Sequence, residues 1–542
     1  MATKVIDCLY GAMTAVTRKK KVTEDMYETP LKRCLGTFDL TLLGIGHMIG
    51  AGIYVLTGTV VKELAGPSAV LSYLFAGFVA LLAALCYAEF GAKVPKAGSA
   101  YSYIYVSIGE LMGFIIGWNI ILEHLLGASS VARAWSGAID SLFDGAIRNG
   151  TIEYIGHLGK GSKWISDYPD FIAFGISIII FIVIATGTKF TMNFNSVFTL
   201  INIIVIIFLI CAGFYYANLA NWTDPKKGGF FPNGFGGTLS GAATCFFAYI
   251  GFEGIAVAGE EAKKPEKSIP FGTVLALAIV SLMYILVTIS LTLMIPYDEV
   301  STTAAFPMAF ATRGAHWIKV IVAIGTLFGI TTSLLGSAFS VSRAVYAMAS
   351  DGILFSFLGY VHPRTKTPII GIAVFGLLSA FMSLLFEIQT LVEFMSIGTL
   401  LAYTIVAAAV IIVRYQSVAD CQFKLKAEEE ADEATTGTTE ESAIIKKSKS
   451  HDDFGKLKEK LRDLPILKSV PAGRAALYAT YTMIVFIVCF CLVLIVGFSH
   501  LRDGAWWAII LAIFFSSGMV FCYLIMIAHE KNDAFLTFQV RT

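Results

Sequence analysis

Long apolar stretches recur along the whole chain and are separated by short polar segments. A membrane-spanning helix needs about 20 predominantly apolar residues. Stretches of about this length predict twelve spans, at roughly 38–60, 67–90, 104–136, 171–188, 194–217, 239–259, 271–295, 317–348, 369–386, 391–413, 477–498 and 505–528. The pattern therefore predicts an all-α polytopic membrane protein.

Composition supports the same class. Of the 542 residues, 56% are hydrophobic and 15% are charged, and the mean hydropathy is +0.73. Soluble domains carry about 25% charged residues, so a soluble multidomain protein is excluded. The net charge of +1 gives no sign of a nucleic-acid partner. The nine cysteines form no metal-binding spacing, and we expect neither a metal nor a cofactor.

Charged residues divide the chain into segments and orient it. With twelve spans both termini lie on one side of the membrane, and the positive-inside rule places that side in the cytoplasm. The basic residues on this side include Arg18, Lys19, Lys20, Lys21, Lys32, Arg33, Lys93, Lys96, Lys263, Lys264, Lys267, Arg343, Arg364 and Lys366. We expect cytoplasmic segments at 1–37, 414–476 and 529–542, and a plasma-membrane location with an internal membrane as the alternative.

The 414–476 loop alternates acidic and basic blocks, and its middle has few apolar residues, which is typical of disorder. It is either a tolerated insertion or a regulatory segment in which Ser448 and Ser450 are candidate phosphorylation sites. Two N-x-S/T sequons, at Asn149 and Asn221, fall in loops predicted to be external. They are candidate glycosylation sites.

The first span contains an unusual run of glycines, with four between Gly44 and Gly52. Gly46 and Gly50 have the spacing of a helix-packing face. Gly50 and Gly52, however, lie on different faces of a helix, so one packing face does not explain both. We therefore favour an unwound point at which Gly50-Ala51-Gly52 exposes backbone amides near the membrane midplane.

The sixth span repeats this pattern at the same depth, with Gly251, Glu253 and Gly254 about halfway along it. Interruptions in spans one and six predict two inverted five-helix repeats, 38–217 and 239–413, with half-helix ends around a midplane site. Helix ends that carry free amides can hold a carboxylate, and freed carbonyls can hold an ammonium group. Such a site suits the zwitterion of an α-amino acid.

The third span places a carboxylate at a similar depth. Glu123 lies near the centre of a long helix, where a lone charge is costly unless it is paired or hydrated. Asn119 precedes it by four residues on the same face, where it can form a hydrogen bond with Glu123. Glu123 is either half of a structural pair or the counter-charge for a cationic substrate. Glu110, nearer the cytoplasmic end, is open to a structural or a transport role.

Motifs between about residues 30 and 415 also match a known family. They are Gly44–Tyr54, Tyr87–Tyr101, Gly127–Trp135, Phe247–Glu253, Arg364–Ile370 and Met395–Tyr403. These segments resemble the cationic amino acid transporters of the amino acid–polyamine–organocation superfamily. The resemblance implies the LeuT-like 5+5 inverted-repeat fold with two extra C-terminal spans. It also implies sodium-independent transport of arginine, lysine and ornithine by alternating access, driven by the substrate gradient and the membrane potential.

The resemblance further implies roles for single residues. The amides of 50–52 would hold the substrate carboxylate, the carbonyls near Ile49 and Ile250 the α-ammonium, and Phe252 would be an aromatic gate. Asn202 stands where proton-coupled bacterial relatives carry a lysine, and its neutrality argues against a proton switch. With the residues discussed above, the candidate substrate-binding set is Ile49, Gly50, Ala51, Gly52, Glu123, Ile250, Gly251 and Phe252. The candidate gating or transport set is Glu110, Asn119, Asn202 and Glu253.

One departure from the family concerns span number. The family usually has fourteen spans and this sequence accounts for twelve, so we expect the ten-helix core to retain transport, with a shortened splice form as the alternative. A carrier of other amino acids and a non-transporting amino acid sensor are the competing functions. An enzyme is not expected, because His47 and His124 lack convergent acid–base or metal-binding partners. The sequence does not indicate an oligomeric state.

Overall fold

The computed structural model describes residues 18, 20, 29–50, 52–143, 145–159, 162, 164–224, 228–302, 305–315, 317–415, 474–497, 500 and 505–529. Within these residues the regular structure is helical, and two isolated bridges, Leu35–Ala262 and Ile165–Phe386, are the extended pairings. The chain forms two compact units. The larger comprises residues 25–103 and 111–404, and the smaller includes 104–110 and 405–537.

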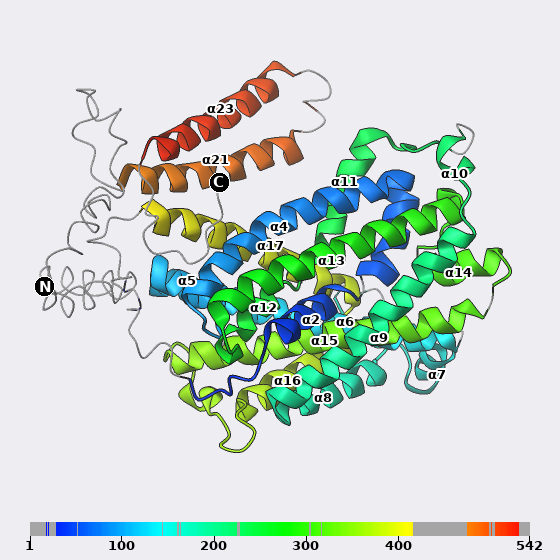
Figure 1. Cartoon of the computed structure of the whole chain (residues 1–542), viewed down its shortest axis with the longest axis horizontal. Helices are drawn as coiled ribbons and strands as arrows, with labels where there is room; N and C mark the ends of the chain where they lie inside the picture. The colour runs from blue at the N-terminus through cyan, green and yellow to red at the C-terminus, as the bar shows by residue number, and fades with distance from the viewer. Residues whose placement is uncertain are drawn as a thin grey trace, which may run out of the picture. The chain divides into compact units, whose positions relative to one another are not determined.

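The larger unit is a bundle of long helices (Figure 1). Its main helices are α2 (Thr37–Met48), α4 (Ala69–Lys93), α6 (Glu110–Leu142), α8 (Phe171–Ala185), α9 (Thr188–Tyr215), α11 (Gly234–Phe246), α12 (Glu253–Val257), α13 (Pro265–Met294), α15 (Ile318–Ser350), α16 (Ile369–Leu385) and α17 (Ile388–Tyr415). The shorter helices are α3 (Thr57–Thr59), α5 (Ala100–Ser107), α7 (Ala146–Ile155), α10 (Ala220–Thr223) and α14 (Ala305–Thr312). The short α2 contacts α9, α13 and α15.

Helices of membrane-spanning length confirm the polytopic class. In the described part of the chain, nine helical segments are long and apolar enough to cross a membrane: Thr57–Lys93, Glu110–Leu142, Thr188–Tyr215, Gly234–Glu261, Pro265–Met294, Ile318–Ser350, Ile388–Tyr415, Ala475–Val496 and Trp506–Ala528. The shorter apolar helices α8 and α16 coincide with the fourth and ninth predicted spans, and α2 with the start of the first.

The third predicted span, 104–136, has the wrong boundary. Residues 104–107 belong to the separate helix α5, and α6 begins at Glu110 and continues to Leu142. Gly109 between them has φ +143°, which an α-helix does not accommodate. Glycine adopts this conformation at little cost, and it separates the two helices.

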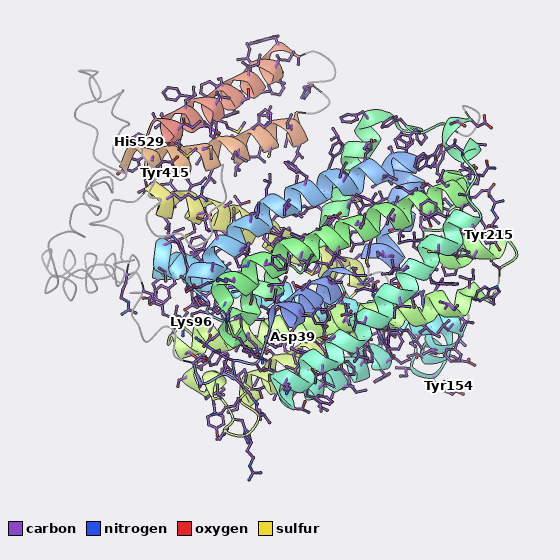
Figure 2. The ribbon with its side chains drawn as sticks, in the orientation of Figure 1. Asp39, Lys96, Tyr154, Tyr215, Tyr415 and His529 are labelled. Carbon is purple, nitrogen blue, oxygen red and sulfur yellow. The ribbon has the colours of Figure 1, made fainter. Side chains whose placement is uncertain are left out.

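The outer surface of the larger unit is apolar. Large side chains such as Phe78, Ile204 and Ile397 are more than 60% exposed on long helices, as expected where hydrocarbon replaces water. Figure 2 places Tyr154, from a loop predicted to be external, and Tyr215, at the external end of the fifth predicted span, at the end of the unit opposite Lys96. This arrangement agrees with the predicted separation of external and cytoplasmic loops.

The smaller unit contains α21 (Arg474–Val496) and α23 (Trp506–Ala528), which run side by side (Figure 1). A Cβ on Gly518 would lie 2.3 Å from a ring atom of Phe486, so the glycine allows the two helices to approach closely. Ala476 of α21 and Cys522 of α23 are buried in this contact, in one apolar cluster with Tyr415 at the end of α17. These helices coincide with the last two predicted spans.

Candidate functional site

The first span is interrupted after Met48. The backbone of Ile49 is extended (φ −82°, ψ 90°), and a π-helical segment begins at Gly52. The amide of Gly50 donates to the carbonyl of Met48 at 3.1 Å. Ala51 lies outside the described residues. The break that the glycine pattern predicts is therefore present in the chain.

The sixth span is interrupted at residues 250–252. A short 3-10 turn ends at Tyr249, Ile250 is extended (φ −61°, ψ 133°), and α12 begins at Glu253. Gly251 has φ +126°, a conformation that L side chains rarely adopt. Glycine at this position allows the chain to turn without strain.

The two breaks are tied together by a tyrosine of α13. The hydroxyl of Tyr284 lies 2.9 Å from the carbonyl oxygen of Met48 and 2.9 Å from that of Ala248. A hydroxyl carries one proton, so it donates to one of these carbonyls at a time. No motif in the sequence marks this residue.

A small cavity of about 60 Å³ lies at the breaks. It is lined by His47, Met48, Gly52, Gly127, Val131, Phe247, Ala248, Ile250, Ser333, Ser337 and Met395. A cavity of this volume holds a few waters and is smaller than an amino acid. Two of the predicted substrate-binding residues, Gly52 and Ile250, line it.

The glycines of the first span also pack closely. A Cβ on Gly50 would lie 2.2 Å from the hydroxyl oxygen of Ser333, and one on Gly46 would lie 2.4 Å from that of Thr199. Distances this short are not tolerated by real side chains. The glycines therefore serve helix packing as well as the break, and the two interpretations of the sequence are compatible.

Asn202 of α9 lies beside the first break. Its Nδ2 donates to the carbonyl of Ile49 at 3.4 Å, and its Oδ1 accepts from the Tyr54 hydroxyl at 2.6 Å. The side chain thus joins the two halves of the interrupted span. The Ile49 carbonyl, expected to meet a substrate ammonium, bonds to this amide in the structure.

Two buried carboxylates lie near the breaks. Glu123 is 4% exposed, and its Oε1 accepts from the hydroxyl of Thr399 at 2.7 Å. Glu253, also 4% exposed, accepts at Oε2 from the Gly251 amide at 3.0 Å and from the Tyr403 hydroxyl at 2.7 Å. Its Oε1 has no hydrogen-bond partner among the described residues.

Three aromatic rings surround these acids. The ring of Tyr87 lies 5.7 Å from that of Phe252 and 5.5 Å from that of Tyr403, and the last two are 5.0 Å apart. Glu123 and Glu253 interact electrostatically with each other and with Tyr87. We call these five residues the acidic–aromatic cluster. Glu123 and Phe252, predicted to contact substrate, lie in this cluster and not in the wall of the small cavity.

Two other candidates have partners that the sequence did not indicate. Asn119 donates to the carbonyl of Gly398 at 2.7 Å, so the expected bond to Glu123 is replaced by a contact with α17. The reason is that Glu123 turns toward Thr399. In the smaller unit, Arg18 forms an ion pair of 2.7 Å with Glu110, which places Glu110 in a surface contact.

The polar residues of the cavity wall that sequence reasoning missed are His47, Ser333 and Ser337. The hydroxyl of Ser333 lies 3.2 Å from the carbonyl oxygen of Gly46 and 3.0 Å from that of His47, and it donates to one of them at a time. The sequence does contain a sign of Ser333 and Ser337. Residues 331–342 of the eighth span include several small polar residues in an otherwise apolar helix. Helix interfaces in membranes use such residues for hydrogen bonds.

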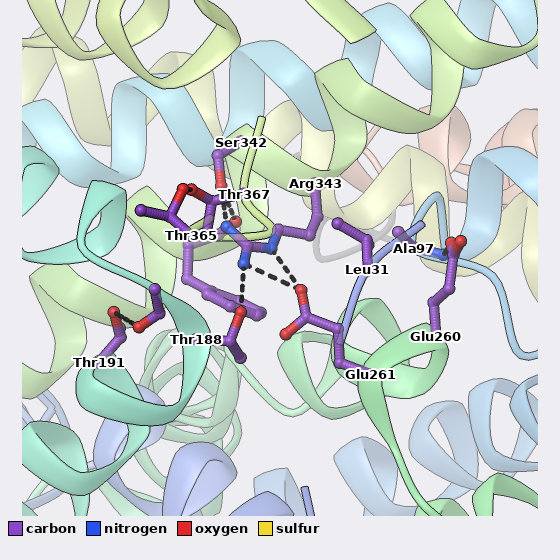
Figure 3. Close-up of polar contacts among 12 residues, drawn as sticks. Leu31, Ala97, Thr188, Thr191, Glu260, Glu261, Ser342, Arg343, Thr365 and Thr367 are labelled. Carbon is purple, nitrogen blue, oxygen red and sulfur yellow. Dashed lines mark hydrogen bonds and ion pairs between the residues drawn. The ribbon is translucent and has the colours of Figure 1, made fainter. Parts of the chain in front are cut away.

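A second charged cluster joins the ends of three spans (Figure 3). Arg343 of α15 is fully buried and pairs with Glu261 at 2.9 Å. Its guanidinium also donates to Thr188 at 3.0 Å and Ser342 at 2.9 Å, and it lies 4.0 Å from the centre of the Phe339 ring. The sequence placed Arg343 on the cytoplasmic side, near the end of the predicted span 317–348, and its partners hold it inside the bundle.

The modification candidates differ in accessibility. Asn149 is exposed on α7, whereas Asn221 is 2% exposed and its Nδ2 donates to the carbonyl of Leu293 at 2.7 Å. Nδ2 is the atom that would carry a glycan. Ser448 and Ser450 lie outside the described residues. Within the described ranges, no group of three or more His, Cys, Asp or Glu side chains is placed to hold a metal ion.

Comparison with known proteins shows which protein family this chain resembles. Residues 35–425 match the amino acid permease family. The chain is 41% identical to cationic amino acid transporter 4 of Mus musculus and 40% identical to that of Homo sapiens. These alignments cover 98% and 97% of this chain, and 84% and 83% of the relatives. A branched-chain amino acid permease of Bacillus subtilis is 37% identical, over 74% of this chain and 86% of its own length.

Proposed function

Because the chain belongs to the amino acid permease family, we propose that it carries cationic L-amino acids such as arginine, lysine and ornithine across a membrane. Transport is sodium-independent and proceeds by alternating access. The names of the two mammalian relatives support the substrate class. The observation that carries the proposal is the pair of adjacent helix breaks beside two buried carboxylates that lack a salt bridge in the described residues.

The proposed architecture is the LeuT-like pair of inverted five-helix repeats, 38–217 and 239–413, with interrupted helices one and six. The residues at the two breaks would hold the α-carboxylate and α-ammonium of the substrate. The cationic side chain would reach the acidic–aromatic cluster, where carboxylates and aromatic faces both favour a cation. The cavity of about 60 Å³ must enlarge to admit an amino acid, which alternating access requires.

The proposed location is the plasma membrane with both termini cytoplasmic, and an internal membrane is the alternative. The predicted placement of basic residues supports this orientation. In this arrangement 1–37, 414–476 and 529–542 are cytoplasmic segments, and Ser448 and Ser450 are accessible to kinases.

A carrier of neutral amino acids is the second candidate, favoured by the similarity to the branched-chain amino acid permease. In that case Glu123 and Glu253 would share a proton instead of binding a substrate cation. A non-transporting sensor would keep the site but not the transport cycle.

Uptake by purified protein in proteoliposomes separates these functions. We expect radiolabelled arginine to accumulate and unlabelled lysine and ornithine to compete, with weaker competition by leucine. Leucine uptake without arginine uptake would favour the neutral carrier, and binding of arginine without uptake would favour the sensor.

A further inference from the structure

Tyr284 lies where the two helix breaks meet. It belongs to α13, is fully buried, and its hydroxyl lies 2.9 Å from the carbonyl oxygens of both Met48 and Ala248. Met48 is the last residue of α2, and Ala248 lies in the turn just before the second break. Both residues line the cavity of about 60 Å³. One side chain from a third span therefore holds the backbone of both interrupted spans at the cavity.

The ring of Tyr284 is fixed by two other tyrosines. It stacks on the ring of Tyr73 of α4, with 5.0 Å between the ring centres, and meets the ring of Tyr249 edge-on at 5.3 Å. The Tyr249 hydroxyl donates to the backbone carbonyl of Tyr73 at 3.0 Å. These contacts leave the Tyr284 hydroxyl little freedom to move away from the two carbonyls. The packing of the second, sixth and seventh spans therefore determines its position.

The second half of the first span also contacts these tyrosines. The Tyr73 hydroxyl oxygen lies 3.2 Å from the carbonyl oxygen of Gly52 and 2.9 Å from the hydroxyl oxygen of Thr57. A Cβ on Gly52 would lie 2.4 Å from the Tyr284 hydroxyl oxygen, so glycine at this position allows Tyr284 to reach the break. Tyr284 thus holds the first span before its break, and Tyr73 holds it after the break.

We propose that Tyr284 is a positioning residue for the substrate head group: its hydroxyl fixes the spacing of the two breaks, and this spacing fits the α-ammonium and α-carboxylate of an amino acid. The inference rests on the proposed function, which places the head group at the breaks. Among the described residues Tyr284 lies behind the cavity wall, so it acts through the backbone of Met48 and Ala248. The spacing matters because hydrogen bonds weaken steeply when they are misaligned.

A role in head-group binding differs measurably from a role in folding. Without the hydroxyl the two breaks can move apart while the ring still packs against Tyr73. A ligand that uses both head-group charges would then lose the most affinity, because its two sets of contacts require one separation. A ligand with one head-group charge would lose less. A lower amount of folded protein would instead reduce uptake without changing relative affinities.

The test compares arginine with two analogues in proteoliposomes that contain the wild-type protein or Tyr284→Phe. δ-Guanidinovalerate lacks the α-ammonium of arginine, agmatine lacks its α-carboxylate, and both keep the guanidinium. Inhibition constants of the three unlabelled compounds are measured against uptake of radiolabelled arginine. Their ratios give the preference for a complete head group. We expect this preference to fall about 3- to 30-fold in Tyr284→Phe, the range for groups coupled through one hydrogen-bond network.

Tyr249→Phe is the matched control. It removes an equally buried hydroxyl from the same group of rings, but this hydroxyl bonds to the backbone of α4 and not to Met48 or Ala248. Its head-group preference should therefore stay within about twofold of the wild-type value. An equal fall in Tyr249→Phe would assign the effect to the packing of the rings and overturn the inference.

A rescue variant separates the hydrogen bond from the ring. Tyr284→p-aminophenylalanine, introduced by stop-codon suppression, keeps the ring and supplies two N–H donors, one for each carbonyl. Its head-group preference should return toward the wild-type value, because both breaks are held again. A preference as low as that of Tyr284→Phe would contradict the proposed role of the donor.

The remaining outcomes also decide the proposal. Equal losses of affinity for arginine and both analogues in Tyr284→Phe would overturn it. If Tyr284→Phe does not reach the membrane, Tyr73→Phe replaces it, because this variant releases Gly52 and Thr57 at the same break. It should lower the head-group preference in the same direction, and an unchanged preference would count against the inference. Failure of the wild-type protein to take up arginine would instead overturn the proposed function.

Discussion

At the scale of single residues, the buried acids fall into two types. Glu261 has a full ionic partner in Arg343. Glu123 and Glu253 are held by hydroxyl and amide donors, and no salt bridge to either is formed by the described residues. Neutral donors alone compensate the negative charge of a carboxylate poorly in a membrane. A bound cationic substrate would supply the missing counter-charge.

The first prediction concerns Glu123→Gln. The amide keeps the shape of the side chain but removes the charge that would pair with arginine, so arginine uptake should lose about 2–4 kcal/mol of transition-state stabilisation. Uptake or competition by glutamine should fall less or increase, because the head-group contacts remain. Equal losses for both substrates, at equal surface expression, would assign Glu123 a structural role.

The glycines at the breaks provide a second prediction. Leucine at Gly50 would meet Ser333, and leucine at Gly251 would combine a clash with His47 and a φ of +126°. We expect either variant to lose most arginine uptake, because the backbone can no longer approach the substrate. Gly175→Leu on α8 is the control, since a Cβ there meets nothing within 4 Å. Normal uptake by Gly251→Leu would contradict a role for this break.

At the scale of secondary-structure elements, the ends of three spans meet at Arg343. Glu261 follows α12, Thr188 begins α9, and Arg343 lies near the end of α15 (Figure 3). A second acid, Glu260, accepts from the Ala97 amide at 2.8 Å. These contacts fix the sixth, fifth and eighth spans to one another on the side predicted to be cytoplasmic.

Breaking this ion pair should destabilise the bundle. Glu261→Gln leaves the fully buried Arg343 without its counter-charge, which typically costs about 3–5 kcal/mol. We expect a lower Tm in detergent and lower expression. Arg148→Gln is the matched control, because its 3.9 Å contact with Asp167 joins two exposed side chains and should matter little. Equal Tm values for the two variants would contradict this account.

The sequons provide another prediction at this scale. Asn149 is exposed on α7, whereas the Nδ2 of Asn221 is engaged with Leu293. Asn149→Gln should therefore remove a glycan in mammalian cells, seen as a faster band on a denaturing gel. Asn221→Gln should leave the mobility unchanged. A mobility shift for Asn221→Gln would show that this segment rearranges before glycosylation.

At the scale of the whole molecule, the proposed transport moves net charge. A cationic substrate crossing 100 mV gains about 2.3 kcal/mol, equivalent to roughly 50-fold accumulation. Asn202 is neutral and engaged with Ile49 and Tyr54, so it cannot act as a proton carrier. We therefore expect inward arginine currents at pH 7.5 that persist when sodium is replaced by choline. Loss of the current at fixed voltage would contradict sodium independence.

The sequence by itself determined the class of protein, most of its long apolar helices and the two helix breaks. An apolar run long enough to span a bilayer has few structures open to it other than a helix, because there the backbone must satisfy its own hydrogen bonds. Gly50, Gly52 and Gly251 were informative because Gly251 has a positive φ and the other two allow neighbouring helices to approach closely. Even here Gly109 was missed, and the third span was predicted to begin too early.

Only the tertiary structure decided which polar groups meet. Asn119 pairs with Gly398 on α17, Glu123 with Thr399, and Arg343 with Glu261. These partners are separated by between 82 and 279 residues. A one-dimensional pattern shows the face of a helix on which a side chain lies, but not the neighbouring helix that it contacts. The space for the His47 ring is left by Gly251, Gly254 and Gly336, which belong to two other elements, so it exists only once those helices have packed around α2.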